Sequence, residues 1–370
     1  MQYYLPFTLG FVAIITAICV YYFYCLYRQR KKSNEKVLPP IMTDIELETL
    51  HEIPNSNVQL NTLYSPMLEY NLDKYVLTEI KREEIRLEKL LSRGVFGLVY
   101  QAKIKNLERP GMEIPAAIKM LQKDASSQEK KKFLEEARLM NHFRHKHVLR
   151  LLGVCLDEDS PLIVLELMEN GDLLQYLKDN RKLQPSDSHA LRLQDLFSMC
   201  EDIARGCCYL EDLRFVHRDL ACRNCLISAR DRENRIIKIG DFGLARDLKN
   251  DYYRKIGQGL LPICWMAPES LVIGIFTSKS DVWSFGVLMW EITSLGEHPY
   301  TGRTNLEVID YVRAGGRLPM PLNCPPPLYE LMLRCWNPAN DRPNFKLCLE
   351  NIIALRNDIE DTLLSPVDII

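Results

Sequence analysis

Residues 214–227, Arg-Phe-Val-His-Arg-Asp-Leu-Ala-Cys-Arg-Asn-Cys-Leu-Ile, carry two overlapping chemical signatures. Cys222 and Cys225 have the C-x-x-C spacing of a redox or zinc site. The segment from His217 to Asn224 has the H-R-D-x-x-x-x-N spacing of a loop that supports phosphoryl transfer. These signatures predict different proteins, so the motifs before and after this stretch must decide between them.

A glycine-containing segment at 91–99, Leu-Ser-Arg-Gly-Val-Phe-Gly-Leu-Val, precedes this stretch. It matches G-x-G-x-x-G-x-V with Ser92 in the first glycine place, followed by Gly94, Gly97 and Val99. Glycine lets backbone amides approach phosphate oxygens because no Cβ intervenes. Hairpin turns favour glycine for other reasons, so this segment alone predicts a phosphate-binding loop only weakly.

A lysine closes the apolar run Ala116-Ala-Ile-Lys119. A structural role would make it an edge-strand charge, whereas a functional role would direct its ammonium to the α- and β-phosphates of a nucleotide. In the functional case a carboxylate must hold the lysine in place. Glu136 can supply that carboxylate, since it falls in the helix predicted over 128–143.

Three further side chains that carry oxygen atoms complete the group of residues that phosphoryl transfer needs. Asp219 is the candidate acceptor of the substrate hydroxyl proton, and Asn224 is a candidate Mg²⁺ ligand. Asp241 opens Asp-Phe-Gly and is the second candidate ligand, because Mg²⁺ prefers carboxylates and phosphate oxygens. Ala-Pro-Glu269 follows in the expected order. A thiol site would need a helix N-terminus or a second ligand pair; the sequence offers neither, so the cysteine pair is incidental to the loop.

The ordered motifs from Gly94 to Glu269 resemble those of a protein kinase, over a domain expected at about 84–358. The resemblance implies ATP as phosphate donor with Mg²⁺, or alternatively Mn²⁺, as the metal. It implies an α+β fold of two lobes, a small β-rich N-lobe with one helix and a large helical C-lobe. The hydrophobic pattern agrees, because strand-like runs precede residue 171 and the helical period dominates after it, as in 193–212.

Two segments resemble tyrosine kinases rather than serine/threonine kinases. Arg223 lies in Leu-Ala-Cys-Arg-Asn, similar to the A-A-R-N of tyrosine kinases, and is implied to be catalytic beside Asp219. Pro262-Ile-Cys-Trp-Met266 is similar to the platform that holds a tyrosine substrate. Segments such as Leu165-Glu-Leu-Met-Glu-Asn-Gly-Asp-Leu-Leu174 and Asn250-Asp-Tyr-Tyr-Arg-Lys255 most resemble the sevenless/Ros group of receptor tyrosine kinases, near the insulin-receptor branch.

The same resemblance implies roles by position. Leu165 corresponds to the gatekeeper, and Glu166 and Met168 would meet adenine through their backbone groups. Val99 and Ala117 are also implied to contact the nucleotide.

Further positions are implied to stabilise or regulate the domain. Arg342 is implied to pair with Glu269, and Asp281 to brace the catalytic loop. Tyr252 and Tyr253 correspond to activation-loop autophosphorylation sites, where phosphate would pair with Arg218.

Two substitutions depart from the family pattern, Ser92 for glycine and Cys264 for the platform Arg or Lys. They keep open a pseudokinase scaffold that binds nucleotide without efficient turnover. Another alternative is an adaptor that acts through Asn61-Thr-Leu-Tyr64, an N-x-x-Y motif. The main hypothesis is an active tyrosine kinase whose partners are tyrosine-containing proteins, with SH2- or PTB-type adaptors as further candidates.

Residues 5–27 carry no charge and are long enough to cross a bilayer as one helix. Basic residues follow at once from Arg28, which predicts that the rest of the chain is cytoplasmic. A cleaved signal peptide would instead have basic residues first and a shorter apolar run. We therefore expect a plasma-membrane protein with self-association in the membrane. Its predicted segments are an extracellular stub (1–4), a membrane helix (5–27), a juxtamembrane linker (28–83), the kinase domain (84–358) and a short tail (359–370).

The composition gives no support to a nucleic-acid-binding protein or to a disulfide-rich protein. The net charge of −2 gives no overall attraction to nucleic acid. Twelve cysteines scattered singly through a chain of 370 residues do not form a disulfide framework, and they indicate reduced, buried thiols.

Overall fold

The computed structural model describes the following residues: 77–94, 97–122, 125–157, 160–184, 186–187, 189–247, 253–254 and 261–364. All belong to one compact unit, Asn71–Ile370. Within these described segments, no helix is both long and apolar enough to cross a membrane. The predicted membrane helix at 5–27 lies outside them.

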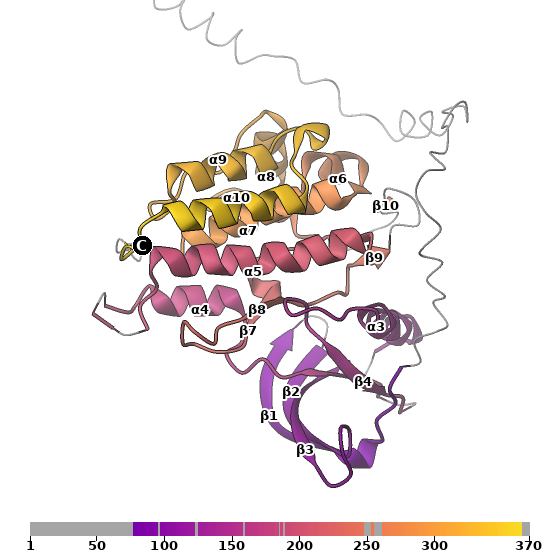
Figure 1. The fold of residues 1–370 in the computed structure, drawn as a ribbon. Coiled ribbons are helices and arrows are strands. Elements are labelled where there is room, and N and C mark those ends of the chain that lie inside the picture. The colour runs from indigo at the N-terminus through magenta and orange to yellow at the C-terminus, as the bar shows by residue number, and fades with distance from the viewer. Residues whose placement is uncertain are drawn as a thin grey trace, which may run out of the picture. The chain divides into compact units, whose positions relative to one another are not determined.

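An antiparallel sheet of five strands forms the N-terminal lobe, in the order β1-β2-β3-β5-β4 (Figure 1). Its strands are β1 (Ile85–Gly94), β2 (Gly97–Lys105), β3 (Glu113–Met120), β4 (Leu151–Cys155) and β5 (Leu162–Glu166). One face is sealed by buried aliphatic side chains such as Ile104, Ile118 and Val164. The sheet forms here because β-branched residues pack well on a half-buried pleated surface.

The one helix of this lobe is α3 (Ser127–Met140), which begins at a capping box made by Ser126 and Glu129. Its buried face is Phe133, Glu136, Ala137 and Met140. The helix predicted over 128–143 therefore begins one residue too late and ends three residues too late. Phe143 lies beyond the helix and packs against Phe242, with 4.8 Å between the ring centroids.

The C-terminal lobe is helical, so the predicted two-lobed α+β fold is confirmed (Figure 1). Its helices are α4 (Leu173–Asn180), α5 (Leu193–Asp212), α6 (Pro268–Ile273), α7 (Ser278–Thr293), α8 (Asn305–Arg313), α9 (Pro326–Cys335) and α10 (Phe345–Asp358). Its two-stranded sheets pair β6 (Phe215–Val216) with β9 (Arg246–Asp247), β7 (Cys225–Ile227) with β8 (Ile237–Ile239), and β10 (Tyr253–Arg254) with β11 (Ile275–Phe276). Short 3₁₀ turns occur at η2 (Arg82–Glu84), η3 (Cys222–Asn224), η4 (Ile263–Trp265) and η5 (Ala339–Asp341).

Helix α7 is buried along almost its whole length, from Ser280 to Thr293. The burial follows from its mostly apolar sequence, since a helix that is apolar all round belongs in a core. Its two buried carboxylates, those of Asp281 and Glu291, accept hydrogen bonds from segments that surround the helix.

Residues 359–364 fold back onto the start of α5, and we call them the C-terminal strap. The α5 N-cap, Arg192, makes no side-chain cap. Instead the Leu193 N–H donates to the Thr362 carbonyl oxygen (2.9 Å), and the Gln194 N–H donates to Asp361 Oδ1 (3.2 Å). The Gln194 amide also donates to the Ile359 carbonyl oxygen at 2.7 Å. The strap thus satisfies donors that the first turn of a helix leaves free.

Deleting residues 359–370 is expected to lower the free energy of unfolding by about 2–3 kcal/mol, because several hydrogen bonds worth about 1 kcal/mol each are lost together. Chemical denaturation of the two chains measures the difference. Deleting only 365–370 is the matched control, since it removes none of the strap contacts described above. Equal stability of the two deletions would show that the strap contributes nothing.

Candidate active site

A buried ion pair joins the two elements of the N-terminal lobe. The ammonium of Lys119, on β3, lies 2.7 Å and 2.9 Å from the two carboxylate oxygens of Glu136 on α3. Asp241 Oδ1 lies 3.7 Å from the same ammonium. Burial alone lowers the pKa of Lys119, but these two carboxylates outweigh it and raise the pKa above its ordinary value. Lys119 is therefore a fixed cation beside Asp241.

The glycine-containing segment is a β-hairpin, with Gly94 opposite Gly97 at the end of the β1–β2 pairing. Gly97 has φ +133°, and a Cβ there would lie 1.9 Å from the Met120 carbonyl oxygen. Only glycine fits, because the backbone of β3 approaches so closely. Ser92 pairs with Val99, and Val99 pairs in turn with Lys119, so the hairpin lies directly beside the lysine.

The predicted adenine-binding positions cluster where β3 meets β5. Ala117 pairs with Leu165, and both are buried together with Met168. The Glu166 carboxylate is bound elsewhere: it accepts from Lys238 Nζ at 2.7 Å and from the Arg150 N–H at 2.8 Å. These two donors occupy its side chain, and its predicted backbone contact with adenine stays a prediction.

The loop from His217 to Asn224 brings three predicted residues into contact. The Asn224 amide donates to the Asp219 carbonyl oxygen at 2.7 Å, and the Arg223 guanidinium donates to the Asp219 carboxylate. Burial raises the pKa of Asp219 above its usual value, although Arg223 and Asn224 oppose the shift. A raised pKa makes the carboxylate a better proton acceptor.

Asp281 braces this loop from α7, as expected. Its carboxylate accepts from the His217 N–H (2.6 Å) and from the Arg218 N–H (2.9 Å). Arg218 needs such support because its φ is +69°, a conformation that is costly for a residue with a side chain. Burial raises the pKa of Asp281 to about 7.

Asn224 and Asp241 are placed together by the β7–β8 hairpin. Cys225 pairs with Ile239, so the residue before β7 and the residues after β8 lie at the same end of the hairpin. The Gly240 N–H donates to the Asn224 carbonyl oxygen at 2.8 Å and fixes this arrangement. Asp241 itself has φ +53°, which is unusual for a residue other than glycine.

The cysteines of the opening stretch are structural. Cys222 and Cys225 are both fully buried, and burial raises the pKa of each thiol. A buried neutral thiol is neither a good nucleophile nor a metal ligand. No disulfide joins any of the ten cysteines in the described segments, and no cluster of metal-binding side chains occurs there.

Sequence reasoning did not single out Glu291, which lies 1% exposed on α7. Its Oε2 accepts from the Cys222 N–H at 3.0 Å and from the Trp265 indole at 2.9 Å. Burial raises the pKa of Glu291 to about 7. The one signal available was an acidic residue inside an apolar helix, which is rare unless the residue is paired.

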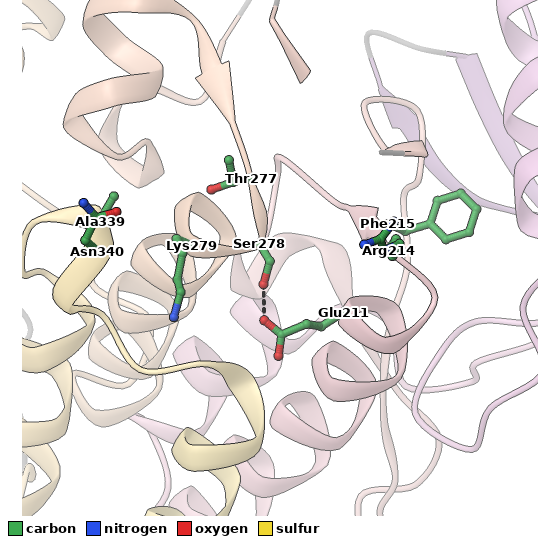
Figure 2. A pocket seen from close by; sticks show the side chains of 8 residues that line it. All are labelled: Glu211, Arg214, Phe215, Thr277, Ser278, Lys279, Ala339 and Asn340. Atoms are coloured by element: carbon green, nitrogen blue, oxygen red, sulfur yellow. Dashed lines mark hydrogen bonds between the residues drawn. The ribbon is translucent and has the colours of Figure 1, made fainter. Parts of the chain in front are cut away.

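A cavity of about 360 Å³ lies apart from these residues, between the end of α5, β6 and the start of α7. Figure 2 shows its lining, where the Ser278 hydroxyl donates to Glu211 across the cavity wall. None of the predicted site residues lines it, and we assign it no function.

The two-lobed fold, the Lys119–Glu136 pair and the Asp219 loop together define a protein kinase. The family model for protein tyrosine and serine/threonine kinases matches residues 85–352, and the chain belongs to this family.

The most similar relatives include tyrosine kinases of the Ros and sevenless group. The chain is 47% identical over 325 residues to the tyrosine-protein kinase transforming protein ros of UR2 avian sarcoma virus, covering 86% of this chain and 81% of that protein. It is 45% identical to the human proto-oncogene tyrosine-protein kinase ROS, over 94% of this chain and 15% of that protein. For the protein sevenless of Drosophila melanogaster the identity is 44%, over 90% of this chain and 13% of that protein.

These relatives confirm the predicted resemblance, and the chain is a protein tyrosine kinase. It spans about one-seventh of the human and fly proteins. The family uses ATP and a divalent metal, and its tyrosine kinases act on protein tyrosines. No observation favours the pseudokinase alternative.

Proposed function

We propose that this chain transfers the γ-phosphate of ATP to protein tyrosines, with Mg²⁺ as the metal, in a kinase anchored to the plasma membrane. The single observation that supports catalysis most strongly is the convergence of Lys119, Glu136 and Asp241 within ion-pair distance. In this proposal Lys119 binds the α- and β-phosphates, and Glu136 keeps its ammonium aligned. The hairpin would cover the phosphates with its backbone, at Ser92, Gly94 and Gly97.

The donor set of the loop fits a hard divalent cation. Asp241 offers a carboxylate, and the Asn224 amide directs its nitrogen to the Asp219 carbonyl oxygen, so its Oδ1 is the atom it would offer. Oxygen atoms of this kind suit Mg²⁺, or Mn²⁺ in its place. The metal supplies charge neutralisation at the phosphates. Asp219 accepts the tyrosine hydroxyl proton, and Arg223 orients its carboxylate.

Activation by phosphorylation is part of the proposal. Tyr252 lies outside the described residues, while the backbone of Tyr253 pairs with Phe276 in the β10–β11 ladder. The Arg218 guanidinium carbon lies 5.3 Å from the centroid of that same Phe276 ring. Because the backbone of Tyr253 pairs with Phe276 and Arg218 lies against the Phe276 ring, we propose that phosphate added to this segment binds the Arg218 guanidinium.

The remaining parts of the proposal concern the whole protein. Membrane anchoring rests on the uncharged segment 5–27, and self-association in the membrane would bring two kinase domains together for trans-phosphorylation. Phosphotyrosine-binding adaptors of the SH2 or PTB type are the proposed downstream partners.

Incubating the chain with ATP and Mg²⁺ and mapping phosphate by mass spectrometry tests this function. We expect phosphotyrosine at Tyr252 or Tyr253, transfer to a tyrosine peptide but not to its serine counterpart, and loss of both on adding EDTA. Replacing Mg²⁺ by Mn²⁺ should restore transfer, whereas Ca²⁺ should not, since it prefers a larger and looser oxygen shell. A folded protein that binds ATP but gives no phosphotyrosine would refute catalysis.

A further inference from the structure

We infer that Asp361 in the C-terminal strap is a positioning residue, which holds Asn224 and Asp241 in place through the far end of the β7–β8 hairpin. The inference deepens the proposed function and rests on it, since these two residues are the metal ligands proposed there. Asn224 lies directly before β7, and Asp241 lies shortly after β8. The other end of the hairpin is the connecting segment 228–236, which contacts the strap.

A network of charged groups joins the strap to this connecting segment. Arg232 Nη1 donates to Asp361 Oδ2 at 2.9 Å, and Arg232 Nη2 donates to Asp195 Oδ2 at 2.5 Å. Asp195, in the first turn of α5, also accepts from the Arg235 guanidinium. Two arginines of the connecting segment are thus bound to one carboxylate of α5, and one of them is bound to the strap as well.

The network is anchored on its buried side. Asp195 is 3% exposed, and the side chain of Arg235 is 5% exposed. The pair between Arg232 and Asp361 is partly exposed, and an isolated pair of that kind contributes little because water screens it. Here Arg232 also binds the buried Asp195, so the strap carboxylate adds a second fixed point to an arginine that is already held. We therefore expect Asp361 to restrict Arg232 to one position.

The strap carboxylate is itself well held. It accepts from the Gln194 N–H at 3.2 Å and lies 2.8 Å from Arg192 Nε. Burial by itself would raise the pKa of Asp361, but Arg232 and the Gln194 N–H lower that pKa below its ordinary value. The carboxylate is therefore charged at neutral pH and remains available as an anion to Arg232.

The connecting segment can pass this constraint to the strands. Ser228 Oγ donates to the Asn234 carbonyl oxygen at 3.1 Å and accepts from the Ile236 N–H at 2.9 Å, so the segment is closed where it meets the strands. Strands β7 and β8 have three residues each. At their opposite end the Gly240 N–H donates to the Asn224 carbonyl oxygen. Because the hairpin is so short, a displacement of the segment should reach this bond through contiguous hydrogen bonds.

Four variants separate positioning from mere stability. Asp361→Asn removes the charge but keeps the size of the side chain, and Arg232→Gln removes the bridging cation. Asp361→Glu restores the charge and should recover most of the wild-type behaviour. Glu360→Gln is the matched control, since it removes the same charge from the exposed neighbouring residue of the strap.

Hydrogen exchange in the metal-free, full-length chain tests the positioning directly. We expect the Gly240 N–H to exchange about 3- to 10-fold faster in Asp361→Asn and in Arg232→Gln, because changes along such networks have effects of this size. Exchange of the Ile118 N–H, in the sheet of the N-terminal lobe, should stay unchanged. Glu360→Gln should match the wild type at both positions. Wild-type exchange at Gly240 in both variants would overturn the inference, and so would an equal rise at Ile118, which would show a loss of stability alone.

Combining the two changes tests the route through Arg232. If Asp361 acts on the hairpin through this arginine, the double variant should exchange the Gly240 N–H at the rate of Arg232→Gln alone, because the second change removes nothing further. Effects of the two changes that multiply would overturn this route.

The dependence of phosphotransfer on Mg²⁺ is the functional readout. In Asp361→Asn, the Mg²⁺ concentration that gives half-maximal transfer to a tyrosine peptide should rise about 3- to 10-fold, since groups that orient metal ligands govern metal affinity. At saturating Mg²⁺, kcat should change by less than about twofold, because the bound ion itself draws its ligands together. Glu360→Gln should match the wild type. An unchanged Mg²⁺ dependence in Asp361→Asn would overturn the inference. Absence of phosphotransfer by the wild-type chain would instead refute the proposed function, and hydrogen exchange alone would then decide whether Asp361 positions the hairpin.

Discussion

Replacing Asp219 by asparagine is expected to lower kcat for a tyrosine peptide by about 10²- to 10⁴-fold, the usual contribution of a positioned general base. Asparagine is nearly isosteric, and its side-chain oxygen can still accept from Arg223. The bond from the Asn224 amide goes to the backbone oxygen of residue 219, so it survives the change. The loop geometry is retained and the proton acceptor alone is lost.

Steady-state kinetics at saturating ATP and Mg²⁺ measure this effect. The KM for ATP should change little, because no nucleotide contact involves Asp219 in the proposed mechanism. Asp358→Asn is the matched control, since Asp358 is exposed at the end of α10, and it should leave kcat unchanged. A loss below tenfold in Asp219→Asn would show that another group accepts the proton.

Removing the guanidinium of Arg342 is expected to have the largest effect on stability. Arg342 is 3% exposed and forms a two-point ion pair with Glu269, at 2.6 Å and 2.9 Å. Its Nη1 also donates to the Lys279 carbonyl oxygen at 2.8 Å. Arg342→Met should therefore lower the free energy of unfolding by about 3 kcal/mol, because the Glu269 carboxylate and the carbonyl groups of Lys279 and Asn337 lose this donor.

Denaturant titration of purified proteins measures that difference. Lys346→Met is the matched control, as it removes a cation from an exposed position on α10 and should change stability by less than about 0.5 kcal/mol. Arg342→Lys should recover only part of the loss, since an ammonium cannot pair at two points. Equal stability of Arg342→Met and the control would contradict a structural role for the pair.

The sequence allowed the motif-bearing parts of the site to be predicted because their chemistry leaves few residue choices. Glu136 was predicted to hold Lys119 and Asp241 was identified separately, and the structure brings all three together. The helix at 193–212 was also predicted correctly, since its apolar stripe is long and regular. Helix α3 ended earlier than predicted, because Phe143 continues the apolar pattern in sequence but packs against Phe242 outside the helix.

Long-range polar contacts could not be predicted in this way. Glu291 bonds to Cys222 across 69 residues, and nothing local to either residue specifies that partner. The same holds for Asp361, whose bond to the Gln194 backbone spans 167 residues. Hydrophobic periodicity reports which face of an element is buried. It carries no information on which distant donor a buried acceptor will meet.

The C-terminal strap also has a consequence for the newly synthesised chain. Helix α5 starts at Leu193, but the oxygen that receives its first N–H belongs to Thr362. At about 5–20 residues per second, a ribosome needs roughly 8–34 s to add the residues between them. During that interval the amino end of α5 lacks its partner, and the buried face of the helix has no α10 to pack against. This lobe should therefore complete its folding only after residues 359–364 have left the ribosome, and stalled chains that still hold the strap inside the ribosome should show lower protease resistance at α5 than chains that carry it outside.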